Sequence, residues 1–162
     1  MKKTAGLCHD IATANGFDPC TWDNLPIKAM LVITELHEAM DAADGVGDPL
    51  SEELADIAIR LLGMLHGIWG DDWHVRPLVT PVGNNLERIE VIMRPTGRAV
   101  SRAVEAWRCN NQVDARGWLE VALRNTRHVA IRVGVNLGDA IYLKCVKNRG
   151  RGKLHGKARA EG

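Results

Sequence analysis

Two stretches rich in apolar residues, 27–43 and 51–69, lie on either side of a short turn of Asp, Gly and Pro residues. Each stretch repeats apolar side chains at the three- and four-residue spacing of an α-helix. Pro26 suits the first turn of a helix that would end at Asp44-Gly45. The linker over 44–50 is short enough to turn the chain back on itself. The pattern therefore predicts an antiparallel helix hairpin at the centre of the fold.

The predicted hairpin carries two pairs of acidic residues. Glu35 and Glu38 are three residues apart, as are Glu53 and Asp56, so each pair faces one way on its helix. Facing helices would bring the four carboxylates together, where like charges repel unless a cation or a proton compensates them. Carboxylate oxygens are the ligands that Mg²⁺ prefers. The spacing predicts a magnesium site, with Mn²⁺ as an alternative ion.

Ordinary explanations exist for each acidic pair taken alone. An acidic pair at this spacing is typical of a solvated helix face, and Glu53 also suits the first turn of a helix, near the positive end of its dipole. Arg60 lies one turn beyond Asp56 and could neutralise it. His37 is expected to pack or to point to solvent, because magnesium prefers oxygen to nitrogen.

The rest of the chain also reads as helical. Ser51 is the expected N-cap of the second hairpin helix, and Pro95-Thr96-Gly97 is expected to break a later one. No stretch shows the alternation of a convincing strand. We predict an all-α helical bundle in a single domain over 1–162, with a helical insertion at about 70–134 and a basic tail at 149–162. The other helices are expected at 4–14, 86–109, 115–135 and 137–148.

Charge and composition exclude some classes of protein. The net charge of +1 gives no overall bias toward nucleic acid or an anionic membrane. No window approaches 18 uncharged apolar residues, which argues against a membrane span. The first residues lack the apolar run of a signal peptide. The four cysteines are scattered, so we expect free thiols and a cytoplasmic protein.

The acidic pairs lie in a longer motif. Thr34-Glu35-Leu36-His37-Glu38, then fourteen residues, then Glu53-Leu54-Ala55-Asp56, resembles the EExxE…ExxD signature of the MazG-type all-α nucleotide pyrophosphohydrolases, which are related to the dimeric dUTPases. Residues 26–33 and 55–60 also resemble the sequences that flank this signature in the family. Residues 144–157 resemble the Lys…Asn…Arg…His-Gly-Lys tail of small, often phage-borne, MazG-like proteins. Thr34 stands where the signature has its first glutamate.

The resemblance implies a function. It implies a magnesium-dependent hydrolase that cleaves a nucleoside triphosphate to a monophosphate and pyrophosphate, and that assembles as a homodimer or homotetramer in the cytoplasm, or in the host cytoplasm if phage-encoded. Glu35, Glu38, Glu53 and Asp56 would be the catalytic and metal-binding residues. The residues that it implies for substrate binding are Lys28, Lys144, Asn148, Arg151, His155 and Lys157.

Two other readings remain. A catalytically silent relative could bind nucleotides or a protein through the unmatched segment. A nucleic-acid-binding module could use the basic tail, but nucleic acid is the less favoured partner because the chain is nearly neutral and its aromatic residues do not alternate with the basic ones.

Overall fold

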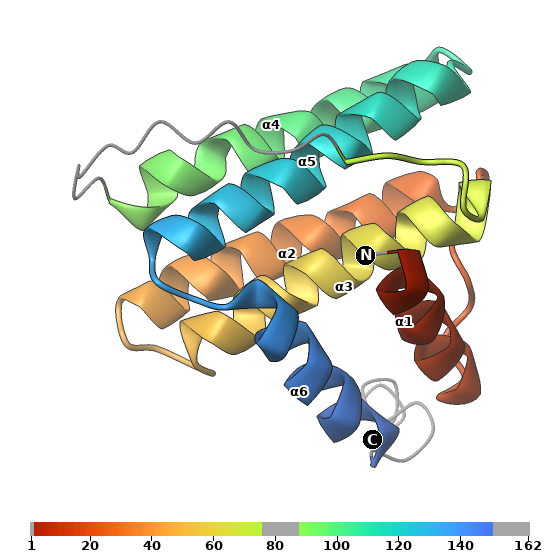
Figure 1. The fold of residues 1–162 in the computed structure, drawn as a ribbon. Helices are drawn as coiled ribbons and strands as arrows, with labels where there is room; N and C mark the ends of the chain where they lie inside the picture. Colours follow the sequence, from red (N-terminus) through yellow and green to blue (C-terminus); the bar gives the residue numbers. More distant parts are fainter. Residues whose placement is uncertain (1, 76–87, 151–162) are drawn as a thin grey trace, which may run out of the picture.

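The computed structural model describes residues 2–75 and 88–150, and six α-helices make up most of them (Figure 1). These ranges contain no strand, so the predicted all-α class is confirmed for the part of the chain that they cover. The helices are α1 (Lys2–Ala14), α2 (Leu25–Ala43), α3 (Leu50–Trp69), α4 (Ile89–Arg108), α5 (Gln112–Arg132) and α6 (Leu137–Arg149).

The helices form two stacked hairpins with two shorter helices on the far side. Helices α2 and α3 run antiparallel, and the α4–α5 hairpin is stacked on them with α4 against α2 and α5 against α3 (Figure 1). Helices α1 and α6 pack against the other side of α3. Helix α3 therefore contacts α1, α2, α5 and α6, whereas α2 contacts α3 and α4.

Helix α3 is central because its sequence is apolar around most of its circumference. Leu54, Ile57, Leu61 and Leu65 are completely buried, as expected for a helix that is covered on several sides. One continuous apolar cluster includes side chains from all six helices. Both hairpins therefore share a single core.

The predicted break in the third long helix is wrong. Helix α4 continues through Pro95 from Ile89 to Arg108. Pro95 is exposed, whereas Met93 and Thr96 on either side are 1% exposed. A proline inside a helix costs about 3 kcal/mol, and the packing of α4 against α2 and α5 outweighs this cost.

Two helix starts also differ from the sequence prediction. Helix α3 begins at Leu50 with Pro49 in the N-cap position, so Ser51 lies inside the first turn and caps nothing. Helix α5 begins at Gln112, earlier than expected, because the side chain of Asn111 accepts a hydrogen bond of 3.1 Å from the backbone N–H of Asp114.

None of the helices in residues 2–75 and 88–150 combines the length and the apolar character needed to cross a membrane.

Candidate metal centre

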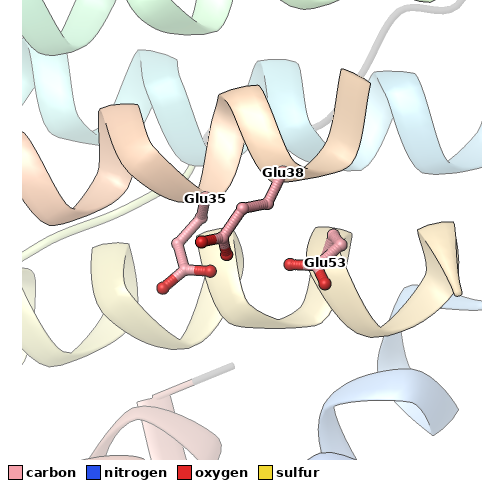
Figure 2. Close-up of side chains that lie close together, drawn as sticks. All are labelled: Glu35, Glu38 and Glu53. Carbon is pink, nitrogen blue, oxygen red and sulfur yellow. The ribbon is translucent and has the colours of Figure 1, made fainter. Parts of the chain in front are cut away.

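Three carboxylates converge between the two helices of the central hairpin. Glu35 and Glu38 project from α2 toward α3, and Glu53 projects from α3 toward them (Figure 2). One oxygen of each carboxylate lies within 4.8 Å of the others. Glu35 and Glu53 are 5% and 6% exposed, while Glu38 is exposed. The cluster is therefore closed on the protein side and open to solvent at Glu38.

Asp56 lies beside this cluster but is bonded to a lysine. Lys144, from α6, places its Nζ 2.6 Å from Oδ2 of Asp56 and 3.1 Å from Oε2 of Glu52. Lys147 adds a second cation 2.6 Å from the same Glu52 oxygen. The side chain of Lys144 is only 4% exposed, so these ion pairs attach α6 to α3 where solvent screening is weak.

An arginine compensates one member of the cluster. The guanidinium of Arg60 lies 2.5 Å from Oε1 of Glu35, across the hairpin. Glu38 and Glu53 make no ion pair with any residue of 2–75 or 88–150. Since Asp56 and Glu52 each have their own lysine, the site carries an excess of two negative charges.

The excess charge appears in the acid–base properties of the site. Burial, together with the nearby carboxylates of Asp56, Glu35 and Glu38, raises the pKa of Glu53 to about 7. Burial also raises the pKa of Glu35, although Arg60 opposes the shift. Burial alone would lower the pKa of Lys144, but its ion pairs with acids outweigh this and raise it, so Lys144 stays a cation.

One oxygen of the cluster has no partner. Oε2 of Glu53 is buried and accepts no hydrogen bond. Leaving a buried charged oxygen unsatisfied costs more than the 1–3 kcal/mol that is typical of a neutral group. A divalent cation would ligate this oxygen and balance the two excess charges, so the donor set fits such an ion.

The structure thus gathers three of the four predicted metal ligands. Asp56 is not in the group, because Lys144 approaches it from α6. The proposed pairing of Arg60 with Asp56 is also replaced, since the hydrogen bond and ion pair of Arg60 go to Glu35. His37 is exposed and outside the cluster, as expected, with Nδ1 2.8 Å from the Ile33 carbonyl oxygen.

Three of the residues predicted to bind substrate, Lys28, Lys144 and Asn148, belong to the described part of the chain. Lys28 lies two turns before Glu35 and donates to the Asp18 carbonyl oxygen at 2.7 Å, not to the acids. Asn148 lies one turn after Lys144, and its Oδ1 is buried with no hydrogen-bond partner. Only Lys144 bonds to the acidic site. The other three, Arg151, His155 and Lys157, lie outside the described residues.

Sequence reasoning missed the ion pairs that surround the cluster. The pairs of Glu35 with Arg60 and of Glu52 with Lys147 join residues on different helices. The available signal was the position of Lys147, one turn from Lys144 on the same predicted helix, which makes both available to one acidic surface.

The converging acids of α2 and α3 can therefore hold a metal ion, and the nearby Lys144 and Arg60 supply fixed positive charge. Comparison of the chain with family models, with curated proteins and with solved structures found no match in any of the three.

Proposed function

We propose that this protein is a magnesium-dependent nucleoside triphosphate pyrophosphohydrolase that cleaves a ribo- or deoxyribonucleoside triphosphate to the monophosphate and pyrophosphate. The observation that carries the proposal is the pair of uncompensated carboxylates, Glu38 and Glu53, beside Glu35. A hard divalent cation prefers such an all-oxygen site, and Mn²⁺ would fit the same donors.

Glu35, Glu38 and Glu53 would hold the ion. When bound, Mg²⁺ neutralises phosphate charge and makes a water molecule more acidic. Glu38 would be the ligand nearest to solvent, because it is the exposed member of the group. Arg60 fixes the Glu35 carboxylate in place through its ion pair, so this ligand needs little reorganisation when an ion arrives.

Lys144 has a separate task in the proposed reaction. Its ion pair with Asp56 keeps that carboxylate compensated, so an approaching triphosphate meets less repulsion than four free acids would impose. Lys144 also holds α6 against the site through Glu52. We assign it to positioning and charge balance rather than to proton transfer.

The MazG resemblance agrees with this arrangement. Thr34, which replaces the first glutamate of the signature, is exposed, and its hydroxyl donates to the Met30 carbonyl oxygen at 3.2 Å. Its side chain is not among the three converging acids. The first carboxylate of the signature is therefore missing from this chain, and Glu35, Glu38 and Glu53 are the acids that converge.

The experiment is a panel of nucleoside triphosphates assayed with Mg²⁺ and with EDTA, with identification of the products. We expect pyrophosphate and a monophosphate, only with the metal. Glu38→Gln should lower the rate at least a hundredfold because it removes one of the two uncompensated charges. Asp10→Asn, an exposed acid on α1, is the control and should keep full activity. Release of orthophosphate, or metal-independent turnover, would contradict the proposal.

The silent-relative reading has one observation in its favour, which is that Asp56 is already bonded to Lys144. It predicts nucleotide binding that is unaffected by Mg²⁺ and never followed by hydrolysis. The same panel separates this reading from the enzyme, because only the enzyme forms pyrophosphate.

Assembly into a homodimer or homotetramer remains a prediction. Three apolar side chains on α2, Ile27, Met30 and Leu31, are 68%, 62% and 37% exposed. Exposed apolar groups that are contiguous on one helix are typical of a contact surface. Sedimentation of the purified protein tests this prediction independently of activity.

A further inference from the structure

Helices α2 and α4 pack against each other. A groove lies between them, on the side of α2 that faces away from the acidic cluster. Glu35 and Glu38 point to α3, whereas Ile33, Leu36 and Met40 line the groove, as helical periodicity requires. The groove has a volume of about 730 Å³, which is within the range of small-molecule sites. It is therefore a second concave surface, distinct from the metal centre.

Three arginines line one wall of this groove. Arg94, Arg98 and Arg102 follow one another at four-residue spacing on α4, and all three are exposed. That spacing places them on one helix face, about 6 Å apart along the axis. Within residues 2–75 and 88–150, none of the three guanidinium groups makes a hydrogen bond or an ion pair.

The acids on the same face of α4 do not compensate these arginines by ion pairing. Glu90, near one end, is 2.9 Å from its own partner Arg88, and Glu105, near the other end, is 2.6 Å from Arg108. Arg102 contributes only a longer-range attraction to Glu105. No acid of the described chain lines the groove, so three adjacent positive charges lie above an apolar floor.

The floor can accept an apolar group. Leu36 and Met93 are almost fully buried beneath it, with exposed fractions of 3% and 1%. Gly97 lies directly over this floor, because a Cβ at residue 97 would be in van der Waals contact with Cδ1 of Leu36, at 3.8 Å. A ligand for this groove should combine several negative charges with a flat or aliphatic part.

We propose that the groove binds an organic polyphosphate, with phosphates on Arg94, Arg98 and Arg102 and the organic group on the floor. Guanidinium groups bind phosphate through paired, charge-assisted hydrogen bonds, and successive turns of α4 can engage successive phosphates. Within residues 2–75 and 88–150, no carboxylate lines the groove to hold a metal. The groove therefore binds its ligand without a divalent cation and without hydrolysing it, independently of the function proposed for the acidic cluster.

The test is binding of a fluorescent ATP derivative to the full chain in EDTA, which leaves the acidic cluster without metal. We expect saturable binding that weakens as salt is added. Arg94→Gln combined with Arg98→Gln should weaken it at least tenfold. The control is Arg108→Gln, on the same helix but bonded to Glu105, and it should bind like the wild type. Circular dichroism confirms that each variant keeps its helices.

A second variant tests the floor. Gly97→Leu should fill the groove while favouring the helix, so it should weaken ATP binding and leave inorganic triphosphate binding within about twofold. Absence of ATP binding in EDTA, or binding that survives loss of the arginines, overturns the proposal. Preference for an oligonucleotide over ATP, lost in the arginine variant, also overturns it and makes the groove a nucleic-acid contact.

Discussion

Replacing Glu53 by Gln should make the metal-free protein more stable, and the gain should depend on pH. Burial and neighbouring acids raise the pKa of Glu53 from 4.5 to about 7, so the folded state holds this proton more tightly than the unfolded state. Stability of the metal-free wild type must then fall as pH rises from about 4.5 to about 7, and level off above it. At about 1.4 kcal/mol per pKa unit, the loss of stability is a little over 3 kcal/mol.

Urea unfolding of the wild type and of Glu53→Gln, in EDTA at pH 5, 6, 7 and 8, measures this difference. We expect the variant to gain about 3 kcal/mol over the wild type at pH 8 and little at pH 5, since Gln carries no proton to lose. Mg²⁺ should stabilise the wild type at pH 8 by preferential binding to the folded state, and should stabilise Glu53→Gln much less.

Glu90→Gln is the matched control for this measurement, because Glu90 is an acid on α4 whose pKa is lowered, not raised. It should leave the change in stability between pH 5 and pH 8 as in the wild type. A Glu53→Gln variant that keeps the pH dependence of the wild type, or that is less stable at pH 8, would refute the view that Glu53 is an uncompensated buried acid.

Further substitutions at three places test the packing and the charge balance, each by thermal or urea unfolding. Lys144→Met should lower the free energy of unfolding by about 3 kcal/mol or more, because it leaves buried acids unpaired. Adding Asp56→Asn should restore part of this loss. A loss below about 1 kcal/mol would contradict a buried ion pair. Gly67→Ala should destabilise the protein by about 2 kcal/mol, since its Cβ would lie 2.5 Å from the Cys20 carbonyl oxygen. The control is Gly63→Ala, whose Cβ meets nothing within 4 Å and which should stabilise by up to about 1 kcal/mol. Equal effects of the two substitutions would contradict the close approach at residue 67. Pro95→Ala should stabilise by about 1 kcal/mol, because α4 is helical on both sides of it, and a loss of stability would show that the proline is needed.

The helices were largely predictable from the sequence because helical periodicity is a local property. Apolar spacing placed the long helices to within a few residues, and the turn at 44–50 correctly separated α2 from α3. Pro95 shows the limit of this reasoning. Whether a helix continues through a proline depends on the packing that holds it on both sides, and the partners of α4 come from distant parts of the chain.

The acidic cluster was partly predictable for the same reason. The spacing of Glu35 from Glu38 is local, and one hairpin is enough to bring Glu53 opposite them. The capture of Asp56 by Lys144 is different, because it requires α6 to cross α3 at one particular position. Local patterns carry no information about that crossing, so the ion pairs of Lys144, which the resemblance assigns to substrate binding, were not predicted.

The groove between α2 and α4 was also only partly predictable from the sequence. The arginines at 94, 98 and 102 are visible in the sequence as a row on one helix face. Their apolar floor comes mainly from α2, and it exists only because α4 packs against that helix. A row of arginines without this floor would be an ordinary solvated surface.

The pairing of acids with bases around the metal centre also constrains how the sequence can diverge. Glu35 is matched with Arg60, Asp56 with Lys144, and Glu52 with Lys147. Losing one partner of a pair leaves the charge of the other without compensation, whereas losing both partners at once leaves no uncompensated charge. These positions should therefore covary in pairs across the helices, whereas Glu38 and Glu53, which have no partner within the described chain, should be either retained together or lost together with the ion.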